Sequence, residues 1–196
     1  ADEYVSDISR GTIQAVVKRF PLKGGLSLDV YDMPGLGDDR KKDKEFEAMY
    51  REILPQCDII IYILEALDGS FAEDIKILKE VVLPCSKEIS KKIIIAMNKV
   101  DMIGVNEGLS WDIRINRPTS RQKELIDKKL DDIVKRFTNV LPVDKKRIIC
   151  YSAIKRYKLL EFMGAIATLT TEGWKFIVTG NLPKWWADRD QMDPQV

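Results

Sequence analysis

Short apolar runs alternate along this chain with longer segments of helical periodicity. Three of the runs are nearly continuous and rich in β-branched residues, namely residues 59–64, 93–97 and 147–151. Continuous runs of this length are typical of parallel strands that are covered on both faces. A fourth run, residues 26–31, alternates so that Leu26, Leu28 and Val30 share one face. That pattern predicts a half-buried strand.

Helical spacing of apolar residues fills the intervals between the runs. It predicts helices over residues 43–54, 71–83, 119–137 and 159–169. Pro118 and Thr119 mark the start of the third helix, and Ser120 is a candidate cap. A weaker strand, residues 14–20, precedes the alternating run, and Lys23-Gly24-Gly25 would join the two as a hairpin. Strands that alternate with helices predict an α/β fold with a mostly parallel sheet.

Two segments depart from this alternation. Residues 102–118 are long for an α/β connection and include Trp111, so we expect a binding loop there. Residues 181–196 contain Trp185-Trp186 and end in polar residues, which favours a tail. The predicted organisation is one domain over residues 1–176, followed by a tail over residues 177–196.

Composition narrows the function classes. The net charge of +1 predicts no general affinity for nucleic acid or membrane surfaces. The absence of histidine excludes histidine-based acid–base chemistry and histidine-ligated metal sites. Three cysteines without paired spacing suit a reducing compartment. With no apolar run as long as a membrane span and no signal peptide, a cytoplasmic protein is expected.

The run over residues 93–97 is followed by Asn98-Lys99-Val100-Asp101, which has the pattern N-K-x-D. A carboxylate at Asp101 can accept hydrogen bonds from N1–H and the 2-amino group of guanine. Because adenine lacks that amino group, such a site can discriminate by roughly 10⁴ or more. Asn98 would tie the loop together, and the Lys99 stem would lie across the base. After the last strand, Ala153 would offer its N–H to guanine O6, and Ser152 would brace that loop.

The alternating strand is followed by Asp32-Met33-Pro34-Gly35, which has the pattern D-x-x-G. Asp32 would hold Mg²⁺, through water, and the Gly35 N–H would contact a γ-phosphate. Each motif taken alone is also compatible with an ordinary polar turn. Their order along the chain, with all of them at the carboxyl ends of strands, favours a guanine-nucleotide site.

These residues make the chain resemble the TrmE–Era branch of small GTPases, from Val5 to about the 159–169 helix. The resemblance implies a three-layer G domain of the P-loop NTPase type that binds GTP or GDP with Mg²⁺. In that comparison residues 5–12 match the first switch, and Thr12 matches its Mg²⁺-binding threonine. Leu36 follows the second-switch glycine, where Ras-like enzymes have a water-orienting glutamine. Gly35 and Leu36 are therefore the candidate catalytic positions, and turnover is expected to be slow. The alternative for Leu36 is a residue that serves local packing.

The phosphate-binding pattern G-x-x-x-x-G-K-S/T occurs nowhere in the 196 residues. The resemblance places it upstream of Ala1, so we expect the first strand, the phosphate loop and the first helix to be missing from this chain. A fragment, a natural truncation and a second molecule that fills the gap all remain open. Hydrolysis would then be impaired. The alternative function is a nucleotide-free module that binds a protein partner or another copy, through the Trp185-Trp186 tail or an open sheet edge. RNA binding is poorly supported.

Overall fold

The computed structural model describes residues 4–9, 14–21, 25, 27–36, 40–67, 69, 71–142 and 145–169, with backbone alone for 4–9, 14–16 and 40–43. Its contacts divide the chain into two compact units, which are described separately. The first comprises Ala1–Cys57 with Lys76–Ile89, and the second Asp58–Ile75 with Ser90–Val196. The predicted tail lies outside the described residues.

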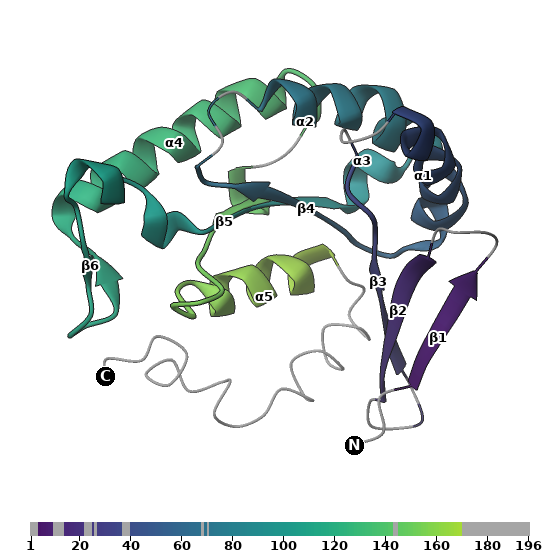
Figure 1. The fold of residues 1–196 in the computed structure, drawn as a ribbon, viewed down its shortest axis with the longest axis horizontal. Helices are drawn as coiled ribbons and strands as arrows, with labels where there is room; N and C mark the ends of the chain where they lie inside the picture. The colour runs from purple at the N-terminus through teal and green to yellow at the C-terminus, as the bar shows by residue number, and fades with distance from the viewer. Residues whose placement is uncertain are drawn as a thin grey trace. The chain divides into compact units, whose positions relative to one another are not determined.

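The first unit contains an antiparallel sheet in the order β1-β2-β3 (Figure 1). The strands span Tyr4–Ser9, Gln14–Pro21 and Ser27–Asp32. The sheet is followed along the chain by α1 (Arg40–Ile53) and the 3₁₀ helix η2 (Leu54–Gln56). The strands predicted over residues 14–20 and 26–31 and the helix over 43–54 are therefore present. The strand β1 carried no sequence signal, because Tyr4–Ser9 mixes polar and apolar residues without a run.

The prediction for the faces of β3 was wrong. Leu28 and Val30 are 39% and 44% exposed, whereas Asp29 and Tyr31 are partly buried. The register of β2 and β3 pairs Val17 with Tyr31, and Val17 is 3% exposed. The packed face of this sheet is therefore the one that carries Val17 and Tyr31. An Arg19–Asp29 ion pair, with Nε 2.6 Å from Oδ1, occupies its outer part.

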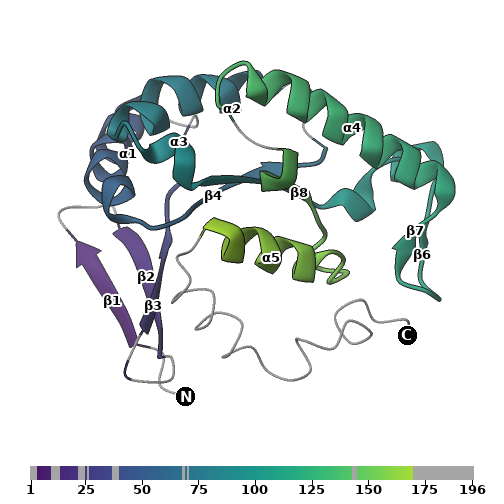
Figure 2. The ribbon, with the colours of Figure 1, turned by 180° about the vertical axis from the view of Figure 1, so that it is seen from behind.

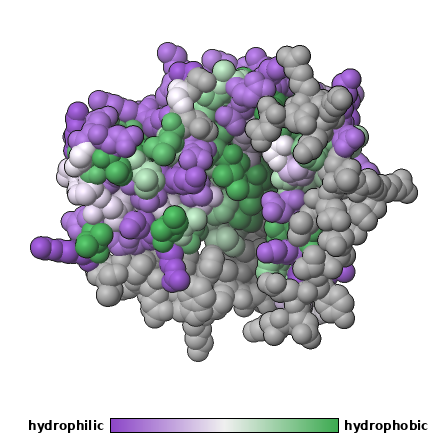
Figure 3. Space-filling model, viewed as in Figure 1, coloured by the Kyte–Doolittle hydropathy of each residue, from purple (hydrophilic) through white to green (hydrophobic). Residues whose placement is uncertain are grey.

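The second unit is built on a parallel sheet in the order β4-β5-β8. Its strands span Ile60–Glu65, Ile93–Asn98 and Ile148–Cys150. Helix α4 (Ser120–Thr138) lies over one face and α5 (Leu159–Leu169) over the other (Figures 1 and 2). Helix α4 turns its charged side chains outward, so hydrophilic colour predominates over it in Figure 3. All three predicted parallel strands and both predicted helices are confirmed.

Strand β4 is not covered on both faces as its apolar run predicted. Ile61 and Ile63 are 40% and 60% exposed, whereas Leu64 is 1% exposed. Tyr62, on the Leu64 face, donates its hydroxyl to the Asp74 carbonyl at 3.0 Å. The exposed isoleucines occupy the opposite face, on which α5 packs mainly against β5 and β8. The edge position of β4 in the described sheet therefore leaves apolar residues uncovered. An apolar run in the sequence does not indicate whether its strand is central or at the edge.

The remaining segments refine the predicted boundaries. Helix α2 (Ala72–Ile77) continues into the π-helix η3 (Leu78–Val82) and the 3₁₀ helix η4 (Leu83–Cys85), where the sequence predicted one α-helix. A short helix, α3 (Ile89–Lys92), precedes β5. Thr119 caps α4, so Ser120 is its first helical residue rather than its cap. Among the described helices, none combines the length and apolar character needed to cross a membrane.

Candidate functional site

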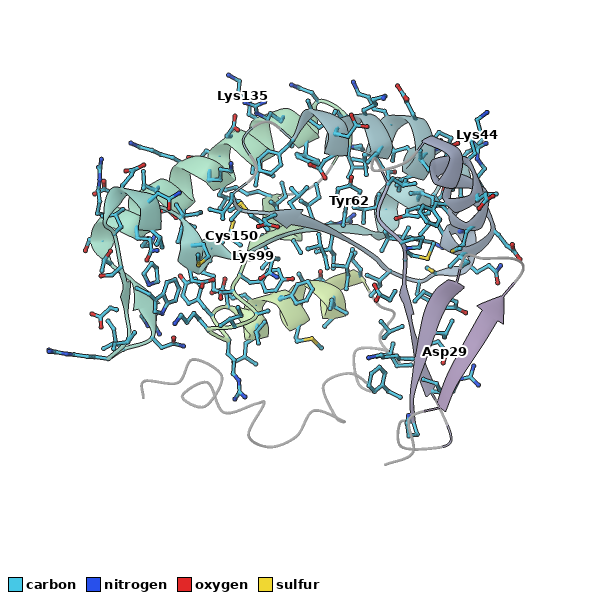
Figure 4. The ribbon with its side chains drawn as sticks, in the orientation of Figure 1. Asp29, Lys44, Tyr62, Lys99, Lys135 and Cys150 are labelled. Carbon is cyan, nitrogen blue, oxygen red and sulfur yellow. The ribbon has the colours of Figure 1, made fainter. Side chains whose placement is uncertain are left out.

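The carboxyl ends of β5 and β8 bring two predicted loops together. The strands are paired so that Met97 lies opposite Cys150, and the Tyr151 N–H donates to the Met97 carbonyl at 2.8 Å. Both strands are buried up to these residues because helices cover them. Asn98 and Ser152 consequently emerge at the same edge of the sheet, near which Figure 4 labels Lys99 and Cys150.

The Asn98 side chain joins the two loops. Its Oδ1 atom accepts hydrogen bonds from the Lys99 N–H at 2.8 Å and from the Ala153 N–H at 3.1 Å. The Asn98 carbonyl accepts a third hydrogen bond, from the Ala66 N–H at 2.9 Å. One asparagine therefore connects the turns that follow β4, β5 and β8. An aspartate could supply the same acceptor but would add a charge, and an aliphatic residue would leave two N–H groups without this partner.

The loop that begins at Ser152 is closed on itself. Ser152 is fully buried, and its Oγ atom accepts a hydrogen bond from the Lys155 N–H at 3.0 Å. Its backbone exchanges two hydrogen bonds with Tyr157, at 3.2 and 3.0 Å. The sequence assigned the Ala153 N–H to guanine O6, but here that N–H donates to Asn98. A base at this position would have to share or replace that bond.

Lys99 has a left-handed backbone, with φ of 63°, which is uncommon for a residue other than glycine. Its Nζ atom lies 2.9 Å from a carboxylate oxygen of Glu65, at the end of β4. The Lys99 side chain is half exposed and is held beside the edge of the sheet by this ion pair. The sequence predicted the place of Lys99 but not Glu65 as its partner, because Glu65 belongs to no recognised motif.

Asp101 lies in the 3₁₀ turn η5 (Val100–Met102) and is 8% exposed. Gln122, in the first turn of α4, donates through Nε2 to the carbonyls of Asp101 and Ile103, at 2.9 Å each. Gln122 is fully buried. Sequence reasoning treated this helix only as an amphipathic element, and a buried polar residue at one of its inward positions was the signal that it missed.

The expected binding loop over residues 102–118 is structured. It contains the 3₁₀ turn η6 (Val105–Glu107) and a small hairpin of β6 (Trp111–Asp112) and β7 (Arg117–Pro118). The Trp111 Nε1–H donates to Asn116 Oδ1 at 3.0 Å, and Asn116 Nδ2 donates to the Lys155 carbonyl at 2.7 Å. The Trp111 ring meets Tyr157 edge to face, with centroids 5.1 Å apart. This segment is therefore a brace for the Ser152 loop.

The loop after β3 belongs to the other compact unit. Asp32 and Gly35 are exposed, and Leu36 is partly buried. A Cβ atom built at Gly35 would meet no described atom within 4 Å, so the fold does not itself require glycine there. The Tyr50 hydroxyl, from α1, donates to the Pro34 carbonyl at 2.9 Å. Burial raises the pKa of Tyr50, and the nearby Asp32 charge raises it further.

Asp32 is the predicted metal ligand whose position the structure describes. Among the residues with a described position, no group of three or more acidic, cysteine or histidine side chains could hold a metal ion. Thr12, the other predicted metal ligand, lies outside the described residues. A single carboxylate fits Mg²⁺ only where substrate phosphates and water complete the coordination. The magnesium prediction therefore depends on a bound nucleotide.

Cys150 and Tyr151, which lie beside the base-side loops, are both buried groups with raised pKa values. Burial raises the pKa of the Cys150 thiol to about 12, so the thiol stays protonated at neutral pH. Burial also raises the pKa of Tyr151, whose ring stacks on Phe162 with centroids 5.0 Å apart. The Tyr151 ring therefore packs β8 against α5, and Cys150 is a buried core residue.

Sequence comparison finds a family model described as the Gtr1/RagA G protein conserved region, which matches residues 7–143. Two curated proteins of Escherichia coli (strain K12) also match. YfjP is 30% identical over 84 residues, 40% of this chain and 29% of YfjP. YkfA is 32% identical over 76 residues, 36% of this chain and 26% of YkfA. The chain thus spans less than a third of the length of these relatives.

Two solved structures of Era have a similar fold. One is a point variant of Aquifex aeolicus Era bound to GDP and AlF₄⁻, with 23% identity, a TM-score of 0.57 and coverage of 86% of this chain and 50% of that chain. The other is Era in complex with MgGDPNP and nucleotides 1506–1542 of 16S ribosomal RNA, with 23% identity, a TM-score of 0.56 and coverage of 86% and 49%. The α/β fold predicted through the Era resemblance is confirmed.

Proposed function

The chain belongs to the Gtr1/RagA G protein family, and from this premise we propose that it binds a guanine nucleotide through the loops that follow β5 and β8. The observation that carries the proposal is the Asn98 side chain, whose Oδ1 atom accepts from both loops. The connection supports an arrangement in which both loops contact one base.

In this proposal Asp101 selects guanine by accepting hydrogen bonds from N1–H and the 2-amino group. Asp101 is almost fully buried, so a base that left its carboxylate without donors would bind with a large penalty. Lys99 covers the plane of the base, with its ammonium group held by Glu65. Ser152 and Ala153 contribute the second loop, in which the Ala153 N–H, while bonded to Asn98, is also shared with guanine O6.

The phosphate side of the proposal rests on the loop after β3. Asp32 would bind Mg²⁺ together with Thr12, and the Gly35 N–H would contact the γ-phosphate. The open space around Gly35 supports this role, because packing does not explain a glycine there. Mg²⁺ would neutralise charge on the phosphates during in-line attack by water. Leu36 cannot orient that water as a glutamine does, so hydrolysis would be slow.

The first test is a titration of this chain with fluorescent GDP, with GTP and ATP as competitors. The 196 residues contain no G-x-x-x-x-G-K-S/T segment, so base contacts are expected to dominate the affinity that this chain shows. Displacement by GTP but not by ATP is expected. Absence of binding by the folded chain at high micromolar concentration, or equal displacement by both nucleotides, would overturn the proposed base site.

Asp101→Asn sharpens this test, because an amide donates a hydrogen bond where the carboxylate accepts one. Loss of hydrogen bonds to a charged group is expected to weaken GDP binding by roughly 10- to 100-fold and to admit xanthosine diphosphate. The matched control is Asp58→Asn, which changes an exposed carboxylate at the start of the same unit. Unchanged selectivity of Asp101→Asn in competition would remove Asp101 from the base site.

A further inference from the structure

Gln122 is a buried amide that contacts the predicted base loop from outside its motif. It has no exposed surface, and its Nε2 atom donates to the carbonyls of Asp101 and Ile103 at 2.9 Å each. Both N–H groups of the amide are therefore used on one short segment of backbone. Gln122 is 21 residues beyond Asp101 in the sequence, so the contact is made by the packing of α4.

The orientation of the amide is determined by its partners. If the oxygen and nitrogen were exchanged, the oxygen would face two carbonyl acceptors, which is repulsive. In the observed orientation Oε1 is buried without a hydrogen-bond partner among the described residues. An unsatisfied buried acceptor lowers the stability of the folded state. Methionine would fill a similar volume without leaving a buried acceptor unsatisfied. Packing alone therefore does not explain the amide, whereas its two donated hydrogen bonds do.

One backbone hydrogen bond of ordinary length, from the Met102 N–H to the Lys99 carbonyl at 3.0 Å, closes the turn that bears Asp101. The other two backbone bonds of this segment are longer. The Val100 N–H reaches the Tyr151 carbonyl at 3.4 Å, and the Ile103 N–H reaches the Val100 carbonyl at 3.2 Å. Both distances lie at or beyond the long end of the usual range for N–H···O hydrogen bonds. The Gln122 bonds, at 2.9 Å, lie near the preferred distance. Gln122 is thus a principal restraint on the carbonyls of Asp101 and Ile103.

We propose that Gln122 is a positioning residue for base selection, which holds the Asp101 turn so that its carboxylate meets the N1–H and 2-amino group of guanine. This inference rests on the proposed guanine site and adds a residue to it that lies outside the two base motifs. Gln122 acts through the backbone of Asp101 and does not itself touch the base. Its effect should therefore fall on selectivity for the 2-amino group.

The test compares Gln122→Met with the control Gln56→Met. Gln56 also donates from Nε2 to a backbone carbonyl, that of Glu52 at 2.8 Å, but on an exposed helix end in the other unit. The readout is the ratio of the affinities for GDP and IDP, because inosine lacks only the 2-amino group. Loss of the restraint should lower this ratio by roughly tenfold in Gln122→Met and leave it unchanged in Gln56→Met.

A ratio preserved in Gln122→Met, while the wild type prefers GDP, would overturn the role of Gln122 and leave the proposed function intact. A wild type that binds GDP and IDP equally, or neither, would overturn both. Gln122→Glu covers the case in which Gln122→Met does not fold, since it keeps the volume and, when protonated, one donor. Its GDP:IDP ratio should approach that of the wild type as the pH falls and decline as the pH rises, because ionisation removes the donor. A flat ratio in this variant would also contradict the proposal.

Discussion

The loops that follow β5 and β8 are held very differently from the loop that follows β3. In the first region buried or partly buried polar side chains, those of Asn98, Gln122 and Ser152, bind the loop backbones directly. In the second region, the described restraint from a side chain is one hydrogen bond from Tyr50 to the Pro34 carbonyl. Both regions carry motif residues at the ends of strands. Among the described residues, a network of side-chain hydrogen bonds holds the loops of the first region.

The difference has a physical meaning for ligand binding. A loop whose backbone groups are already satisfied loses little entropy when a ligand arrives, so its geometry can discriminate between similar bases. A loop in which Asp32 and Gly35 are exposed, and in which the described residues show one side-chain hydrogen bond, can change conformation at small cost. We therefore expect the base side to be preorganised and the Asp32 side to respond to the ligand.

The largest expected effect comes from removing the connection between the base loops. Asn98→Ala deletes the acceptor of two backbone N–H groups, at 2.8 and 3.1 Å. The free energy of unfolding should fall by about 1–3 kcal/mol, measured by urea denaturation. Binding of fluorescent GDP should be lost, because the two loops would no longer share one acceptor.

The control for this change is Asn106→Ala, which alters an exposed asparagine of the same unit. Its stability should stay within about 0.5 kcal/mol of the wild type. If Asn98→Ala were as stable as this control and retained GDP binding, the base side would not be preorganised by Asn98, and the contrast between the two regions would fail.

The second prediction concerns the buried Cys150 thiol, which should lower the free energy of unfolding only at high pH. Its pKa is raised by burial from 9.0 to about 12, so the folded state disfavours the thiolate. The contribution of the neutral thiol to the free energy of unfolding is fully present below pH 9, the pKa of the thiol in the unfolded chain. It is lost as the pH rises toward 12, the pKa in the folded state. Between pH 8 and 10.5 this group should remove about 2 kcal/mol from the free energy of unfolding.

Cys150→Ala should flatten this alkaline decline by about that amount, although the variant is less stable at neutral pH because a cavity remains. In Cys57→Ala, which changes a partly exposed cysteine, the free energy of unfolding should fall with rising pH as much as it does in the wild type. Denaturation measured at the two pH values provides the comparison. Equal slopes in the wild type and Cys150→Ala would show that the thiol is not buried as described.

The smallest effect is expected on the Asp32 side. Tyr50→Phe removes the hydrogen bond to the Pro34 carbonyl and should lower the free energy of unfolding by about 1 kcal/mol or less. Amide hydrogen exchange at Gly35 and Leu36 should become faster, while exchange at Ala153 should not change. The control is Tyr31→Phe, which changes a tyrosine of β3, the strand that the Asp32 loop follows. Slow exchange of Gly35 and Leu36 in both variants would indicate that the Asp32 loop has restraints other than Tyr50.

Particular elements explain how far the sequence could predict this structure. The runs that became β5 and β8 were identified because a buried parallel strand requires continuous apolar residues. The run of β4 looks the same in sequence, yet Ile61 and Ile63 are exposed, because coverage depends on the reach of α5. The alternating strand β3 was placed correctly, but its faces were exchanged, since alternation defines two faces without saying which one packs.

The base motif shows the same division within the site. The residue types at Asn98, Lys99 and Asp101 follow from the chemistry of guanine and are readable from a short pattern, and their roles stay a prediction. The sequence by itself determined the α/β class, the order of strands and helices, and which turns carry nucleotide chemistry, because these depend on local periodicity and residue type. Only the tertiary structure decided that Gln122, Asn116 and Glu65 support those turns. Each of these contacts joins residues far apart in the chain, and long-range packing, rather than any local pattern, brings their polar groups within hydrogen-bonding distance.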